Sequence, residues 1–248
     1  MKNFTKHIPN TLTCISLVLG FYAAILGISG NYFAAMCAIL FAALFDFFDG
    51  LAARLLNACS AIGKELDSLA DVISFGVAPG MMLYSFLDEL LHTLSWQDSM
   101  ICKCLLLTAF AIPVFSALRL AKFNIDDRQK SSFIGLPVPA HAILWSSLIT
   151  VLAADVHTSY CLIPQLSEYL ASIKPEIMIF VLSLLAVSVS LLLVSEIHLF
   201  SLKTTSFAWQ ASKHIYILFA CSILFITLFG ILGITAALII YIQISIIK

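Results

Sequence analysis

Charged residues are scarce in this sequence. Only 11% of its 248 residues are Asp, Glu, Lys or Arg, against about 25% in an average soluble domain. Apolar residues make up 61% of the chain, more than a soluble core can bury, which indicates a protein that folds in a lipid bilayer. The net charge of −1 gives no sign of a basic surface, so no nucleic-acid partner is expected.

The sequence also has no zinc motif, no long linker and no clear repeat. Its seven cysteines lie mostly in apolar runs, and Cys102-x-Cys104 has no second Cys/His pair at zinc spacing. No small-residue cleavage site follows the first apolar stretch, so we expect that stretch to remain as a membrane span. These absences predict one integral membrane domain over residues 1–248.

Apolar runs predict an all-α, polytopic helical membrane protein with about eight transmembrane helices. The expected spans are roughly 11–29, 31–48, 68–91, 101–121, 136–154, 176–195, 215–229 and 231–247. The second and third spans are expected to continue as helix beyond the membrane, over 49–56 and 61–67. An even number of spans leaves both termini on one side.

Basic residues predict the orientation, because cytoplasmic loops carry an excess of Lys and Arg. With the N-terminus inside, the inner side receives eleven basic residues and the outer side two. The inner set is Lys2, Lys6, Arg54, Lys64, Arg119, Lys122, Arg128, Lys130, Lys203, Lys213 and Lys248, and the outer pair is Lys103 and Lys174. Segment 44–71 is therefore expected to face the cytoplasm from the inner membrane.

The sequence has four aspartates near the predicted cytoplasmic ends of the second and third spans. Carboxylates at a membrane edge are costly and are candidates for function. Asp46 and Asp49 share one helical face, and Asp67 and Asp71 share another, because residues three or four apart lie together on a helix. A short turn would bring the two faces together. The four carboxylates would then repel one another unless cations were bound between them. Carboxylate oxygens favour Mg²⁺ or Mn²⁺, and two such ions can clamp a pyrophosphate.

The residues beside these acids favour a phosphate ligand. Gly50 and Ala53 would let a ligand approach the helix closely, and Arg54 can bind phosphate oxygens with its planar guanidinium. A single pair such as Asp46 and Asp49 could simply be charged residues at a helix end near the membrane interface, with no role in binding. An ion-coupled transporter is the alternative from another class, but a bare cation would give Gly50, Ala53 and Arg54 no role.

Residues 46–71 read D-F-F-D-G-L-A-A-R-L-L-N-A-C-S-A-I-G-K-E-L-D-S-L-A-D. The stretch resembles the signature of the CDP-alcohol phosphatidyltransferases, D-x2-D-G-x2-A-R-x8-G-x3-D-x3-D, at every fixed position. The resemblance implies the helical membrane fold of that family, with a polar cavity open to the cytoplasm, two-metal catalysis and, commonly, a homodimer. The catalytic core would cover about 5–195, followed by an extra C-terminal helical pair over about 214–248.

The resemblance also implies a role for each matching residue. Asp46, Asp49 and Asp67 would bind metal, and Asp71 would both bind the second metal and deprotonate the acceptor hydroxyl. The residues expected to contact the CDP moiety are Gly50, Arg54 and, six residues after the arginine, Ser60.

Three flanking segments resemble the membrane-bound phosphatidylserine synthases. They are Ser74-Phe-Gly-Val-Ala-Pro79 after the last aspartate, Arg119-Leu-Ala-Lys-Phe-Asn124, and Gly135-Leu-Pro-Val-Pro139. The start, Ile8-Pro-Asn-Thr-Leu-Thr13, fits as well. This resemblance implies CDP-diacylglycerol and L-serine as substrates in a membrane of lipids, with phosphatidylserine and CMP as products. Glycerol 3-phosphate or an inositol compound is the alternative acceptor.

Five further residues are candidates for ligand contacts. Arg119 and Lys122 could hold the serine carboxylate or the lipid phosphate, with Asn124 assisting, or could be ordinary basic residues flanking a span. Asn10 and Thr13 could contact the cytidine, or could cap the first helix.

Overall fold

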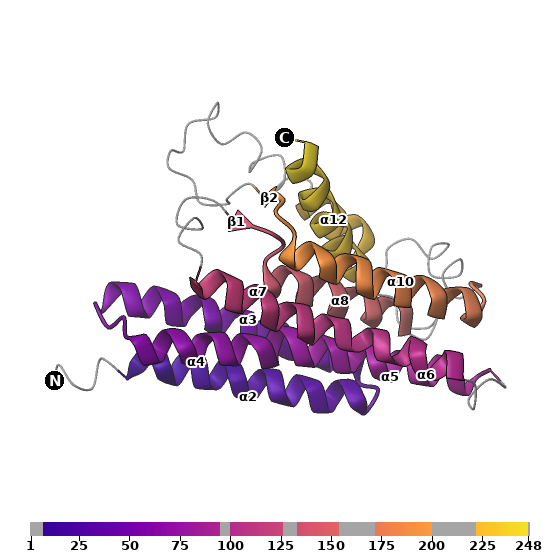
Figure 1. Ribbon diagram of the computed structural model, residues 1–248, viewed down its shortest axis with the longest axis horizontal. Coiled ribbons are helices and arrows are strands. Elements are labelled where there is room, and N and C mark those ends of the chain that lie inside the picture. Colours follow the sequence, from indigo (N-terminus) through magenta and orange to yellow (C-terminus); the bar gives the residue numbers. More distant parts are fainter. Residues whose placement is uncertain (1–6, 95–99, 126–132, 154–171, 200–221, 248) are drawn as a thin grey trace.

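The computed structural model describes residues 7–94, 100–125, 133–153, 172–199 and 222–247. These segments form a bundle of helices, the longest of which lie roughly alongside one another (Figure 1). The elements are α2 (Ile8–Ile28), α3 (Tyr32–Leu55), α4 (Ala61–Asp71), η1 (Val72–Val77), α5 (Ala78–His92), α6 (Met100–Leu107), η2 (Thr108–Phe110), α7 (Ala111–Ile125), β1 (Phe133–Ile134), α8 (Val138–Ala153), α10 (Pro175–Val194), β2 (His198–Leu199) and α12 (Ile231–Ile247). Residues 222–229 are also helical.

The predicted helical membrane fold is confirmed, but the count of eight spans is not. Five helices in the described residues are long and apolar enough to cross a membrane: Ile8–Ile28, Tyr32–Leu55, Ala61–His92, Met100–Ile125 and Pro175–Val194. The apolar helices α8 and Ile231–Tyr241 are shorter. Residues 215–221 of the seventh expected span lie outside the described part of the chain, as do the basic residues Lys2, Lys6, Arg128, Lys130, Lys203, Lys213 and Lys248.

Two of the long helices contain irregular turns. The helix Ala61–His92 is continuous through α4, η1 and α5, and its middle turn Val72–Val77 is π-helical. The 3₁₀ turn Thr108–Phe110 similarly joins α6 to α7. The expected helical extensions over 49–56 and 61–67 are present, since α3 runs to Leu55 and α4 begins at Ala61.

Small residues allow the helices at the centre of the bundle to approach closely. A Cβ atom added to Gly20 of α2 would overlap the side chain of Ser74 in η1. The hydroxyl of Ser74 donates a hydrogen bond of 3.0 Å to the carbonyl of Ser16, and Ser16 donates one of 2.9 Å to the carbonyl of Ala42 in α3. Close packing and hydrogen bonds between helices are the interactions that hold helices together in lipid.

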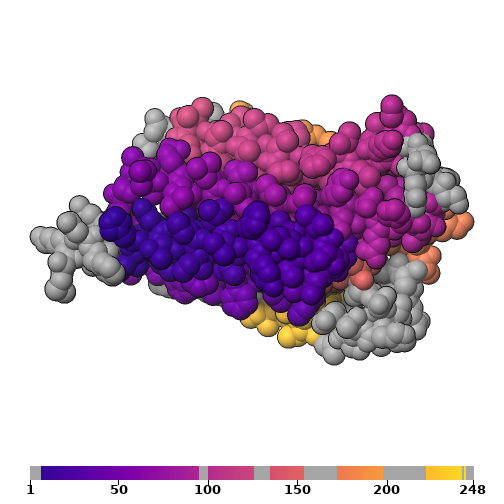
Figure 2. Space-filling model, turned by 90° about the horizontal axis from the view of Figure 1, so that it is seen from below, coloured from indigo at the N-terminus to yellow at the C-terminus, as the bar shows by residue number. Residues whose placement is uncertain are grey.

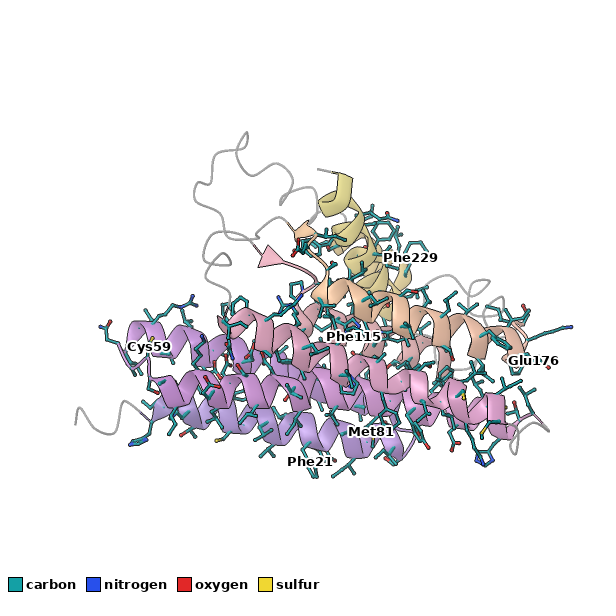
Figure 3. All side chains as sticks on the ribbon, in the orientation of Figure 1. Phe21, Cys59, Met81, Phe115, Glu176 and Phe229 are labelled. Carbon is teal, nitrogen blue, oxygen red and sulfur yellow. The ribbon has the colours of Figure 1, made fainter. Side chains whose placement is uncertain are left out.

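Large apolar side chains cover the outside of the bundle. Val18 is 66% exposed and Phe21 is 62% exposed on α2, whose surface forms a long indigo band on the face seen in Figure 2. Figure 3 shows Phe21 projecting away from the neighbouring helices. Such a surface suits contact with lipid chains and agrees with the apolar composition.

Residues 133–136 are held against the end of α10. Strand β1 pairs with β2 in antiparallel fashion, and the amide of Gly135 donates to the carbonyl of Ile197 at 2.9 Å. Gly135 has a φ of +76°, and an added Cβ would overlap the carbonyl oxygen of Leu193. A glycine is therefore required for this contact, which gives a packing reason for the Gly135-Leu-Pro-Val-Pro139 segment.

Candidate metal and nucleotide site

A tight turn between α3 and α4 builds one end of the candidate site. Asn57 has a φ of 50°, and the amide of Ala58 donates to the carbonyl of Ala53 at 2.9 Å. Ser60 then caps α4, because its hydroxyl oxygen accepts a hydrogen bond of 3.0 Å from the amide of Gly63. The turn returns the chain so that the first part of α4 faces the last part of α3.

Three of the four predicted acids come together between these helices. Asp46, Asp49 and Asp67 each offer a carboxylate oxygen, and these oxygens lie within 4.8 Å of one another. Asp71, one turn further along the helix, lies beside Asp46, with the two carboxyl groups in hydrogen-bonding range. Carboxylates this close repel one another unless cations are bound, and an all-oxygen donor set suits a divalent ion such as Mg²⁺ or Mn²⁺.

Thr13 of α2 fixes the orientation of Asp49. Its hydroxyl lies 2.5 Å from Oδ2 of Asp49 and 3.1 Å from the carbonyl of Pro9. A hydroxyl has one proton to donate, and the shorter distance assigns that proton to the carboxylate. Thr13 is 4% exposed and Asp49 is 5% exposed, so water offers Asp49 little alternative at this position.

A cavity of about 550 Å³ lies beside the acid cluster. It is lined by Pro9, Asn10, Thr13, Asp46, Phe47, Asp49, Gly50, Ala53, Arg54, Ala58, Cys59, Ser60, Gly63, Lys64 and Asp67. An added Cβ at Gly50 would meet no atom within 4 Å, so a side chain there would project into open space. The lining of the cavity therefore combines three carboxylates with Arg54 and Lys64, two cations able to bind phosphate.

The predicted nucleotide contacts have different local settings. Asn10 and Ser60 both line the cavity, and an added Cβ at Gly63 would lie 3.0 Å from a side-chain oxygen of each. The alternative that Asn10 and Thr13 cap the first helix is wrong, because α2 begins at Ile8 and its N-cap residue is His7.

Arg119 of α7 is buried, with 7% of its surface exposed, and lies outside the lining of the cavity. Its guanidinium interacts electrostatically with Asp71 and lies 5.8 Å from the ring centre of Phe123. Asp71 therefore interacts electrostatically both with the other acids and with a buried cation.

Lys122 and Asn124 both contact protein groups. Lys122 donates to the carbonyl of Val194 at 3.4 Å, at the end of α10. The side-chain amide of Asn124 donates to the hydroxyl of Ser68 at 2.9 Å, and the backbone carbonyl of Asn124 accepts a hydrogen bond from Lys64 at 3.3 Å. These contacts tie α7 to α10 and α4, so both residues have a structural role, and their substrate roles stay predictions.

Sequence reasoning missed two features of this site. Lys64 was expected only as an inner-side charge, yet it lines the cavity. The π-helical turn directly after Asp71 was not expected either. Turns of this kind are frequent at functional sites, and the Ser74-Phe-Gly-Val-Ala-Pro79 segment was the available signal, since it covers most of the turn.

Comparisons with known proteins agree with this geometry. Residues 6–174 match the family model described as CDP-alcohol phosphatidyltransferase. A CDP-diacylglycerol–serine O-phosphatidyltransferase of Bacillus subtilis (strain 168) is 39% identical over 134 residues, covering 54% of this chain and 70% of that protein. The enzyme of the same name from Helicobacter pylori (strain ATCC 700392 / 26695) is 36% identical over 138 residues, which cover 55% of this chain and 54% of that protein.

An archaeal relative extends the comparison. The archaetidylserine synthase of Methanothermobacter thermautotrophicus is 34% identical over 150 residues, which cover 59% of this chain and 60% of that protein. The chain therefore matches between half and two thirds of the length of the Helicobacter and archaeal relatives.

Proposed function

The chain belongs to the CDP-alcohol phosphatidyltransferase family, and from this premise we propose that it transfers the phosphatidyl group of CDP-diacylglycerol to the hydroxyl of L-serine. The products are phosphatidylserine and CMP. The serine oxygen forms a bond to the lipid-side phosphorus, and the bond from that phosphorus to the CMP oxygen breaks. We further propose a single domain over residues 1–248, with a core of about 5–195 and a C-terminal helical pair over about 214–248.

One observation carries the proposal: the signature aspartates converge beside a cavity that also contains Gly50 and Arg54. A pyrophosphate needs cations on one side and close access to backbone on the other, and this arrangement offers both. Serine as the acceptor rests on the similarity to the Bacillus and Helicobacter relatives, which are CDP-diacylglycerol–serine O-phosphatidyltransferases.

The acid cluster fits divalent metal in the chemistry of its donors. We assign Asp46, Asp49 and Asp67 as ligands, with Asp71 completing the site for a second ion of Mg²⁺ or Mn²⁺. A divalent metal held by these carboxylates would supply positive charge against the pyrophosphate and so would favour departure of CMP. The hydroxyl of Thr13 donates a hydrogen bond to Asp49 and holds it in the orientation in which it would bind metal.

The remaining steps belong to side chains of the protein. Asp71 accepts the proton of the serine hydroxyl, since it interacts with both the other acids and the buried Arg119. Arg54 holds phosphate oxygens of the CDP group, together with contacts from Asn10, Gly50 and Ser60. Arg119 supplies the positive charge for the serine carboxylate.

The location of the site agrees with a cytoplasmic opening. The cavity-lining Cys59 and the opposite-end Glu176 lie at the two ends of the bundle in Figure 3. Arg54 and Lys64 line the cavity, whereas Lys174 directly precedes α10 at the Glu176 end. We therefore propose an inner-membrane enzyme whose cavity faces the cytoplasm, and a homodimer by analogy with the family.

An acceptor screen tests the proposal. Purified protein in detergent, with Mn²⁺ or Mg²⁺ and labelled CDP-diacylglycerol, is supplied in turn with serine, glycerol 3-phosphate, inositol and inositol phosphate. We expect CMP release and a labelled phosphatidylserine product with serine. Product from another acceptor and none from serine would overturn the acceptor while leaving the phosphatidyl-transfer reaction intact.

A further inference from the structure

Phe47 is the largest apolar side chain among the residues that line the cavity. It follows Asp46, a proposed metal ligand, directly in α3, yet it is 59% exposed. Its ring centre lies 5.8 Å from that of Phe48 in an edge-to-face arrangement, and Phe48 is 43% exposed. Phe47 therefore belongs both to the wall of the cavity and to the apolar surface of α3.

Helical spacing places Phe47 on the membrane side of the phosphate contacts. Phe47 and Arg54 are seven residues apart in α3, so they lie on the same edge of the helix, about 10.5 Å apart along its axis. Between their levels the wall is open, because an added Cβ at Gly50 would meet no atom within 4 Å. Arg54 lies next to the end of α3 at Leu55, so Phe47 lies nearer the middle of the span.

The two ends of the lipid donor make opposite demands on the cavity. The cytidine diphosphate is charged and must reach the acid cluster, whereas each methylene group of the acyl chains resists transfer from lipid into water. The cavity therefore needs an apolar exit through which the glycerol esters stay connected to chains in the bilayer. Leu44, one turn before Phe47, is 46% exposed, and Phe41 is 56% exposed, so apolar surface continues along α3 from Phe47 toward the middle of the span.

We propose that Phe47 is a specificity-determining residue for the lipid donor. Its ring contacts the glycerol esters and the first acyl carbons of CDP-diacylglycerol where the lipid leaves the cavity. This contact fixes the lipid end of the donor while Arg54 fixes the phosphates, so the reacting phosphorus is oriented from both sides. The inference rests on the proposed function, because it takes CDP-diacylglycerol as the donor.

The test measures how the rate of CMP release depends on the mole fraction of CDP-diacylglycerol in mixed micelles with a non-ionic detergent. Phe47→Ala should raise the half-saturating mole fraction about tenfold, as for loss of a large apolar contact. The inhibition constant of CMP, which carries no lipid, and the KM for serine should stay close to wild type. Phe41→Ala is the matched control, because it removes a similarly exposed ring from the same helix at a position that does not line the cavity. The control should titrate as wild type.

Two variants of similar size separate lipid contact from packing. Phe47→Leu keeps an apolar side chain and should retain most of the affinity for the donor, whereas Phe47→Gln should resemble Phe47→Ala. This pair decides the inference even where Phe47→Ala lowers the melting temperature. Equal half-saturating mole fractions for Phe47→Leu and Phe47→Gln would overturn the inference. An equal rise in the inhibition constant of CMP would also overturn it, because that result indicates a disturbance of the neighbouring Asp46.

Failure of the proposed function is a separate outcome, because thermal stabilisation by CDP-diacylglycerol needs neither an acceptor nor turnover. Wild-type protein that is stabilised by neither CDP-diacylglycerol nor CMP would refute the function itself. Wild-type protein that both ligands stabilise, together with a Phe47→Gln variant that the lipid stabilises at the same mole fractions, would refute only the role of Phe47.

Discussion

Removing the hydroxyl of Thr13 should weaken metal binding without disturbing the fold. Thr13→Val keeps the shape of the side chain and removes the donor that lies 2.5 Å from Oδ2 of Asp49. Both residues are buried, so the carboxylate oxygen loses its partner and Asp49 can rotate away from the position in which it faces Asp46 and Asp67. The proposed consequence is a higher metal requirement.

The magnitude follows from the type of hydrogen bond. A bond to a charged group contributes about 1.5–3 kcal/mol, and about 1.4 kcal/mol corresponds to a factor of ten. Partners that orient a metal ligand typically change affinity by about 10- to 100-fold when removed. We therefore expect the half-saturating Mn²⁺ or Mg²⁺ concentration to rise about 10- to 100-fold, with turnover largely restored at high metal.

The assay is a metal titration of CMP release, paired with thermal stabilisation by the metal alone. Thr11→Val is the matched control, because Thr11 lies on the same helix and its exposed hydroxyl donates to the carbonyl of His7 at 2.9 Å rather than to an acid of the cluster. The control should titrate as wild type. Identical metal titrations for Thr13→Val and wild type, in both measurements, would refute the argument that Thr13 orients a metal ligand.

Three further predictions concern the base, the loop and the orientation. Asp71→Asn should lower turnover about 100- to 10,000-fold while CDP-diacylglycerol still stabilises the variant against heat; near-normal turnover would exclude Asp71 as the base. Gly135→Ala should destabilise the protein by about 1–3 kcal/mol and lower its melting temperature by several degrees. Gly30→Ala, at the same φ of +76° but in open space, should lower the stability less. Equal losses of stability would contradict the steric argument. Cysteines replacing Lys64 and Lys103 should react with an impermeant thiol reagent from opposite sides of the membrane, and labelling of both from one side would contradict the orientation.

The acid cluster could be predicted from the sequence because its geometry is mostly local. Asp46 and Asp49 lie on one helical face, Asp67 and Asp71 on another, and a five-residue turn between α3 and α4 leaves the chain little choice but to bring these faces together. The helical extensions could be predicted for the same reason, since the amphipathic pattern continues past the apolar runs.

Contacts between distant segments could not be predicted in this way. Thr13 and Asp49 are 36 residues apart, and Lys122 and Val194 are 72 apart, so no local spacing connects them. A basic residue at the end of a span has the same pattern whether it binds substrate or a backbone carbonyl.

The π-helical turn Val72–Val77 separates two requirements that one helix would otherwise have to meet together. Upstream of it, α4 must present Asp67 and Asp71 to the acid cluster; downstream, α5 must bury Met82, Phe86 and Leu87. A wider turn accommodates one extra residue and shifts the angular phase of everything after it by about 100° relative to a regular helix. A single-residue deletion inside the turn would therefore rotate the core-packing half of this helix against the half that carries Asp67 and Asp71, whereas substitutions in α5 leave that angle unchanged.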